Sequence, residues 1–294
     1  MWVIRKFQPD VIITRFPTTG EGGHGHHTAS AILANEAFTA AADPKRFPEQ
    51  LKYVTTWQAK RILFNSFNFG NMDLTAPDQF KVDVGGYNPL LGKSYGEIAA
   101  ESRSNHKSQG FGAAASRGES FEFLKTTGGT APQNDLFDGV ELTWNRVSGG
   151  AAISASIYRL IASFDLLHPE ASVEGLVKLY QQIAALPDGY WRSQKLKEVQ
   201  ELIAQCSGLF LDATTPFATT TQTDTVRINF SFNNRLGADI VLQRIQVDQF
   251  DTTLAAMMER NQNIIFSKRL YVPATKPYTQ PYWLEEDMAE GYFN

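Results

Sequence analysis

The chain has 294 residues, and 43% of them are apolar, which is enough for about two domains with a hydrophobic core. Its 27 lysines and arginines stand against 31 aspartates and glutamates, and no run of like charges predicts a nucleic-acid-binding surface. The single cysteine excludes an internal disulfide and a multi-cysteine zinc site. No apolar stretch is long enough to cross a membrane. We therefore expect a folded protein without a nucleic-acid partner and without a membrane span.

The first predicted elements are a strand, a glycine-rich loop and a helix. After a short helix end (WVIRKF), the β-branched run Val11–Thr14 is typical of a strand that is covered on both faces. A glycine-rich loop at 17–27 leads to a helix near 29–42, which Asp43 and Pro44 should end. Strand, loop and helix in this order form half of a βαβ unit.

Further along, the sequence predicts a second strand at 61–64 and a helix that begins at Ser94. Ser94 and Glu97 have the spacing of a capping box, and Gly110 is the predicted end of this helix. Three amphipathic helices follow between residues 151 and 211, each with one apolar stripe that indicates a core-facing helix.

From residue 212 the pattern changes to alternating, threonine-rich segments. Val226, Ile228, Phe230 and Phe232 fall on one face of a predicted strand, and a turn follows at 233–237. Only about four strands fit before the last residue, fewer than the roughly seven of a full β-sandwich. We therefore expect an all-β module that is a partial sandwich.

A histidine cluster in the glycine-rich loop is the one constellation with evident chemistry. His24, His26 and His27 are three of the five histidines. Ligands of open α/β sheets bind at the carboxyl ends of strands, and a glycine-rich loop lets the backbone come close to them. His24 and His27 are three positions apart, and with one of them ending the loop and the other opening the helix, both imidazoles can converge on one point. Neutral imidazole is a normal Zn²⁺ ligand, so the loop is a candidate zinc site.

The histidine loop also carries a family resemblance. The string RFPTTGEGGHGHHTASAILANEAF, preceded by IRKFQPDVIIT, resembles the second signature of the PIG-L/LmbE-like de-N-acetylases. These zinc hydrolases remove acetyl groups from N-acetylated amino sugars and related amides. The resemblance implies that His27 is a zinc ligand and that His24 assists catalysis, by stabilising the oxyanion or protonating the leaving amine. The chain departs from the family's GHxDH pattern at His26, which stands where the family has an aspartate.

The family's first signature is an AHPDD string, which supplies the other zinc ligands and a general-base aspartate. No HxDD string occurs in the 294 residues, so we expect a family member that is shortened at its N-terminus. The segments SRSNHKSQGFG, GVELTWNRVSGGAA and VPATKPYTQPYWL resemble parts of long bacterial members, in which a β-sandwich follows the deacetylase domain. An extracytoplasmic location would require a signal peptide ahead of Met1.

Together these features predict an α/β fold. It consists of a Rossmann-like, mostly parallel sheet that is incomplete at the N-terminus, followed by helices and a partial all-β sandwich. The predicted domains are a deacetylase domain at 1–165 without its first strand and HPDD motif, a helical segment at 166–211, and an incomplete β-sandwich-like domain at 212–294.

The predicted function is zinc-dependent hydrolysis of an N-acetyl amide on an amino sugar or glycoconjugate. The alternative is an inactive fragment or a degenerate glycan-binding module, since the signature offers one orthodox zinc ligand and no carboxylate base beside it. Six residues are weaker candidates for supporting the site or contacting the substrate: Glu21, His26, Arg103, His106, Trp144 and Arg146. The structural alternatives are a solvated charge for Arg103, a core or helix-end position for His106, and packing for Trp144 and Arg146.

Overall fold

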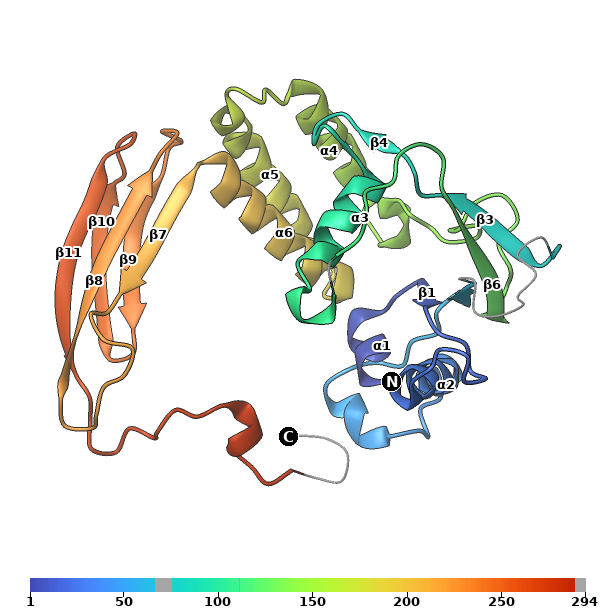
Figure 1. Ribbon diagram of the computed structural model, residues 1–294. Coiled ribbons are helices and arrows are strands. Elements are labelled where there is room, and N and C mark those ends of the chain that lie inside the picture. Colours follow the sequence, from blue (N-terminus) through green and yellow to red (C-terminus); the bar gives the residue numbers. More distant parts are fainter. Residues whose placement is uncertain (67–75, 111, 289–294) are drawn as a thin grey trace. The chain divides into compact units, whose positions relative to one another are not determined.

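The structure is a computed structural model that describes residues 1–66, 76–110 and 112–288 (Figure 1). The chain forms two compact units, Met1–Leu142 and Thr143–Asn294. The helices predicted from residue 151 onward therefore belong to the same unit as the β-rich segments. None of the helices in the described ranges is long and apolar enough to cross a lipid bilayer.

The first unit contains a four-stranded mixed sheet in the order β1-β2-β6-β3. The strands are β1 (Val11–Thr14), β2 (Arg61–Asn65), β3 (Gln79–Asp83) and β6 (Phe121–Gly129). The β1–β2 pair is parallel, whereas β6 pairs antiparallel with both β2 and β3. The fold class is thus mixed α/β. The mostly parallel, Rossmann-like arrangement is not confirmed, because only one of the three pairings among the described strands is parallel.

Helices cover the parallel part of this sheet. Helix α1 (Trp2–Phe7) precedes β1, and α2 (Gly25–Ala40) follows it. Phe38 of α2 packs against Ile62 of β2, and both are buried. Helix α2 begins at Gly25, earlier than predicted, because His24 already has the extended backbone of an N-cap residue. The 3₁₀ helix η1 (Pro48–Lys52) lies between α2 and β2.

A buried arginine ties α1 to the end of α2. The Arg5 side chain is 1% exposed. Its guanidinium donates to the carbonyl oxygens of Ala40 and Ala41 in the last turn of α2. It also donates to acceptors in the loop beyond, which are the carbonyl oxygens of Asp43, Arg46 and Phe47 and the side-chain oxygen of Gln50. Arg5 therefore satisfies acceptors that a helix end leaves unpaired.

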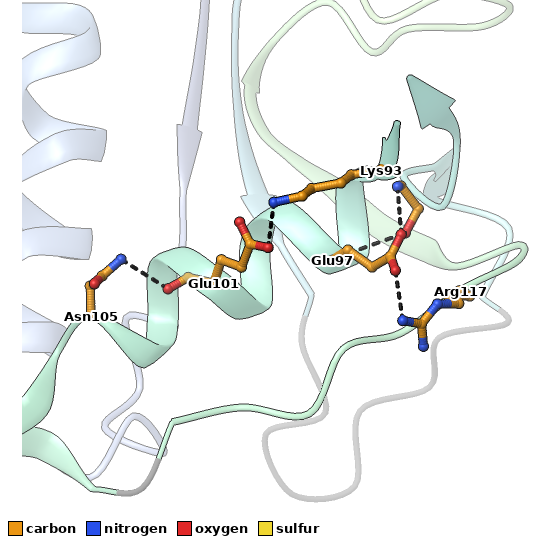
Figure 2. Close-up of polar contacts among 6 residues, drawn as sticks. Lys93, Glu97, Glu101, Asn105 and Arg117 are labelled. Carbon is orange, nitrogen blue, oxygen red and sulfur yellow. Dashed lines mark hydrogen bonds and ion pairs between the residues drawn. The ribbon is translucent and has the colours of Figure 1, made fainter. Parts of the chain in front are cut away.

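The short strands β4 (Tyr87–Asn88) and β5 (Lys93–Ser94) lead into α3 (Tyr95–Ser104). The predicted capping box is confirmed, with Ser94 and Glu97 bonded reciprocally. Ion pairs from Lys93 to Glu101 and from Arg117 to Glu97 surround it (Figure 2). The prediction that Gly110 ends this helix is wrong, since Asn105 caps it and the 3₁₀ helix η2 (Lys107–Gln109) follows.

The second unit begins with helices, as the sequence predicts. The 3₁₀ helix η3 (Trp144–Arg146) precedes α4 (Ala151–Ser163), η4 (Pro169–Ser172), α5 (Val173–Ala184) and α6 (Tyr190–Cys206). The apolar stripes of the three α-helices meet in one buried cluster, made of Ile153, Leu176, Leu179, Ile183 and Val199.

The rest of the second unit consists of two sheets that share one apolar core (Figure 1). One sheet has the order β11-β8-β7 and the other pairs β10 with β9. The strands are β7 (Leu209–Thr214), β8 (Thr225–Asn234), β9 (Val241–Val247), β10 (Phe250–Met257) and β11 (Asn263–Tyr271). The 3₁₀ helix η5 (Tyr282–Leu284) comes later. Ile228, Phe230 and Phe232 are buried on the predicted face of β8.

Strand β7 is an edge strand with an uncovered apolar side chain. Leu211 lies opposite Phe232 in the β7–β8 pairing, so both side chains are on the same face of the sheet. Phe232 is 6% exposed, whereas Leu211 is 58% exposed. The core thus covers this face at β8 and leaves it open at β7.

Candidate functional site

The histidine loop connects the carboxyl end of β1 to the N-terminus of α2. Strand β1 pairs with β2 up to Thr14, which lies opposite Phe64. His24 is the N-cap residue of α2, and its carbonyl oxygen accepts from the backbone N–H of His27 and of Thr28. The strand therefore fixes one end of the loop and the first helical turn fixes the other.

The His27 ring is held in one orientation by two contacts. It stacks on the Phe16 ring, with 3.8 Å between the ring centroids and 5° between the planes. Its Nδ1 atom lies 3.1 Å from the carbonyl oxygen of Gly22. Because a carbonyl oxygen only accepts, this contact favours the neutral tautomer with the proton on Nδ1 and the lone pair on Nε2. A hydrogen bond of this kind is common for a histidine that binds a metal through its other nitrogen.

Gly22 packs closely against Phe16 and His27. A Cβ atom at this position would lie 3.2 Å from the Phe16 ring and 3.4 Å from the His27 Cβ. A side chain at Gly22 would therefore require the Phe16 ring to shift by a few tenths of an ångström.

His24 lies beside His27, as their spacing predicts. The two ring centroids are 5.0 Å apart and the planes are nearly perpendicular, at 86°. Two imidazoles that bind the same tetrahedral ion through bonds of about 2.1 Å have their centres about 5 Å apart. The separation of His24 and His27 thus suits a shared ion, or one ligand with a polar helper beside it.

The imidazoles of His24 and His27 are suitable zinc ligands, but two ligands are too few for a catalytic zinc ion. A catalytic zinc ion has three protein ligands as a rule. Within 1–66, 76–110 and 112–288, no group of three or more histidine, cysteine, aspartate or glutamate side chains is placed to hold a metal ion. The described residues therefore supply two imidazoles and no carboxylate to complete the set.

The two other candidates near the loop are both exposed. The Glu21 carboxylate accepts a hydrogen bond from the Thr19 hydroxyl, and this bond lowers the pKa of Glu21 below its ordinary value. His26 lies in the first turn of α2 with an exposed side chain. Their supporting roles stay predictions.

Arg103 and His106 lie at the end of α3. Arg103 is exposed in the last turn, and His106 is exposed just beyond the helix. Of the two structural alternatives for His106, the helix-end position is confirmed and the core position is not, because α3 ends at Ser104 and His106 is exposed. A substrate contact for either residue stays a prediction.

Trp144 and Arg146 belong to the second unit. Trp144 packs against the helical core and lines an apolar cavity of about 380 Å³ between α4, α5 and α6. The Arg146 guanidinium lies 4.0 Å from the centroid of the Trp191 ring, a cation–π contact. Both contacts favour the packing role that the sequence left open.

Ser66 directly follows β2 and is not among the residues predicted from the sequence. Ser66 is 2% exposed, and its Oγ has no hydrogen-bond partner among the described residues. Its backbone N–H continues the ladder by donating to the carbonyl oxygen of Phe123 at 2.7 Å. The available signal was its position, because polar residues that directly follow a buried strand lie at the ligand-binding edge of an α/β sheet.

Comparison with known proteins adds no assignment: no family model, curated protein or solved structure matches the chain.

Proposed function

We propose that this chain supplies the histidine part of a zinc-dependent hydrolase, which removes the acetyl group from an N-acetylated amino sugar or glycoconjugate. The observation that carries the proposal is the contact between His27 Nδ1 and the Gly22 carbonyl, since it leaves the lone pair on Nε2. The resemblance of the strand, loop and helix to the PIG-L/LmbE signature supports the same role. In this proposal β1, β2 and α2 are the Rossmann-like part of the sheet.

The two histidines have different roles in the proposed reaction. His27 binds the metal through Nε2, with its ring held by Phe16. When bound, zinc supplies a Lewis acid for the acetyl carbonyl and a water of lowered pKa. His24 donates a hydrogen bond to the oxyanion or a proton to the leaving amine. It caps α2, whose N-terminal dipole also favours negative charge there.

The second candidate function is glycan binding without catalysis. It is favoured by the donor set, which among the described residues stops at two histidines. No HxDD string in the sequence offers the general-base aspartate of the family's first signature. Measurements of metal binding and of turnover distinguish the hydrolase from the glycan-binding module.

The first experiment is a calorimetric titration of the 294-residue chain with Zn²⁺. We expect weak binding, because the described residues do not bring three protein ligands together. The His27→Ala variant should lose it, whereas His26→Ala, which changes the exposed neighbouring histidine, should retain it. Equal zinc affinity of the wild-type chain and His27→Ala would contradict the metal role of His27.

The second experiment examines the gene for an HPDD-encoding stretch joined to these residues and measures acetate release from N-acetylglucosamine by that product. His27→Ala should lose zinc and activity together. His24→Ala should keep its zinc and lose about 10²- to 10³-fold in turnover, the scale of one transition-state donor or proton shuttle. Loss of zinc from His24→Ala alone would show that the roles are reversed. Absence of such a stretch, or of turnover, would favour glycan binding.

A further inference from the structure

The starting point is the apolar cavity between α4, α5 and α6, three neighbouring helices of the second unit (Figure 1). Helix α5 packs against both α4 and α6, and it contributes Leu176, Leu179 and Ile183 to the cavity wall. The volume of about 380 Å³ falls within the range of small-molecule sites, which is about 300 to 1,000 Å³. The cavity is therefore large enough for a ligand.

The cavity is elongated along the helices. On α6 its lining residues recur at helical spacing, from Lys195 through Val199 and Leu202 to Cys206. At about 1.5 Å per residue, Lys195 and Cys206 are about 16 Å apart along the helix axis. The wall formed by α4 has the same spacing and consists of Ile157, Leu160, Ile161 and Phe164. A cavity of this shape suits a linear molecule better than a compact one.

The walls of the cavity include apolar side chains that water still reaches. Ile161 on α4 is 66% exposed, and Leu202 on α6 is 44% exposed. Apolar surface that a ligand removes from water contributes to affinity in proportion to its area. A linear apolar ligand would gain affinity from both walls.

The charged residues of the cavity lining neutralise each other. Among the described lining residues, Lys195 and Glu198 are the charged ones, and Lys195 Nζ lies 2.7 Å from Glu198 Oε2. A charged ligand group in the cavity would lose hydration and would have to break this ion pair to find a counter-charge. The lining therefore favours an uncharged ligand.

We propose that the cavity between α4, α5 and α6 binds an uncharged, linear aliphatic molecule, such as a primary alcohol. The aliphatic chain lies against the face of α6 that runs from Lys195 to Cys206. This inference does not depend on the proposed function, because the histidine loop belongs to the first unit.

The first experiment is a calorimetric titration of the 294-residue chain with primary alcohols from hexanol to decanol. The affinity should rise about fourfold with each added methylene, the value of burying one such group. Decanoate and decylammonium at pH 7 should bind about tenfold more weakly than decanol, because each brings a charge to the lining. Affinity that does not change with chain length, or equal affinity for the charged compounds, would overturn the inference.

Cys206 reports whether the alcohol occupies this cavity. It is the single cysteine of the chain, it lines the cavity, and it is partly exposed. Saturation with decanol should therefore slow the alkylation of Cys206 by iodoacetamide. An unchanged alkylation rate would show that decanol binds elsewhere, and it would also overturn the inference.

Two substitutions that fill the cavity test its walls, Leu202→Trp on α6 and Ile161→Trp on α4. Both positions are partly exposed, so a larger ring has room without entering the buried core. Each variant should keep the unfolding midpoint of the wild-type chain and lose about tenfold in affinity for decanol, the equivalent of roughly two methylenes. Leu166→Trp is the matched control, because Leu166 is 76% exposed and does not line the cavity. Wild-type affinity of both cavity variants would contradict the proposed site.

A second copy of the chain is the competing occupant of the cavity. Analytical ultracentrifugation of the wild-type chain and of Leu202→Trp distinguishes it from a small ligand. We expect the same association state for both proteins. A wild-type dimer that dissociates in Leu202→Trp would show that the cavity is an interface between copies, and the inference would then be wrong.

Discussion

At the scale of single residues, Arg5 shows how a charge is buried without a carboxylate. Among the described residues, its acceptors are five backbone carbonyl oxygens and the side-chain oxygen of Gln50. Two of these carbonyls are in the last turn of α2, where the helix dipole is negative. The negative end of the α2 dipole and the carbonyl oxygens that accept from the guanidinium together stabilise the Arg5 charge without an ion pair.

We expect Arg5→Met to destabilise the first unit by about 3 kcal/mol or more, because it leaves several buried carbonyl oxygens without a donor, at about 1 to 3 kcal/mol each. Arg5→Lys should recover only part of this loss, because an ammonium group has three donors and cannot match the guanidinium fork. Urea denaturation measures both. Lys6→Met is the control, because Lys6 is the exposed neighbour on α1 and should change stability by less than about 0.5 kcal/mol. Full stability of Arg5→Lys would contradict this account.

At the scale of elements, α3 is held by its capping box and by the extended segment 113–120, the strap. Residues 113–120 pass close to the helix, and a Cβ atom at Gly96 would lie 2.7 Å from the Ser116 carbonyl oxygen. The Ser94 hydroxyl donates to this same carbonyl at 3.1 Å (Figure 2 shows the adjoining Glu97 contacts). Glu97 joins the two segments, because it caps the helix and pairs with Arg117 of the strap.

The pKa of Glu97 gives this junction a pH dependence. The backbone N–H of Ser94, its hydroxyl and the Arg117 guanidinium lower the pKa of Glu97 below its ordinary value of 4.5. A carboxyl group whose pKa is lowered by folding stabilises the fold above pH 4.5, and this contribution is lost as the pH falls through the lower folded-state value.

Glu97→Gln should therefore unfold at a lower temperature than the wild-type chain at pH 7, and this difference should shrink toward pH 3. Thermal unfolding followed by circular dichroism at both pH values provides the measurement. Glu101→Gln is the control, because its ion pair with Lys93 is exposed on both sides and should have little effect at either pH. A Glu97→Gln difference that stays constant from pH 7 to pH 3 would show that the charge of Glu97 has no role.

Elements with a strong local pattern were predictable from the sequence. The β-branched run of β1, the capping box of α3 and the apolar stripes of α4, α5 and α6 follow from short-range chemistry. Strands β3 and β6 were missed, because QFKVD and FEFLKTTGG mix charged and apolar residues. Their strand structure comes from pairing with each other, about 40 residues apart in sequence, and such pairing has no local signal.

The candidate site was predictable in part for the same reason. The spacing of His24 and His27 in a loop between strand and helix predicted that their rings lie together. The contact of His27 with Gly22 depends on the path of the loop, which no spacing rule fixes.

At the scale of the whole molecule, the division into two units predicts that damage to one core stays local. Phe230 is 2% exposed, and its ring contacts those of Phe232, Phe250 and Phe266. We expect Phe230→Ala to cost about 3 to 5 kcal/mol, the range for truncation of a buried phenylalanine. Hydrogen–deuterium exchange should accelerate across β7 to β11 and remain unchanged in β1, β2 and α2.

Phe217→Ala is the matched control for this prediction. Phe217 lies between β7 and β8 and is 76% exposed, so its removal should leave exchange in both units unaltered. Faster exchange in α2 on Phe230→Ala would show that the two units unfold together rather than separately.

The open edge at β7 also has a consequence for how the chain behaves in concentrated solution. Leu211 is exposed on the core-facing side of a strand that has a partner on one side only among the described residues. Such an edge is a template for strands of other copies. The formal charge of -4 gives only weak repulsion between copies, and it is screened at physiological salt. We therefore expect self-association through β7 to rise with protein concentration and with ionic strength.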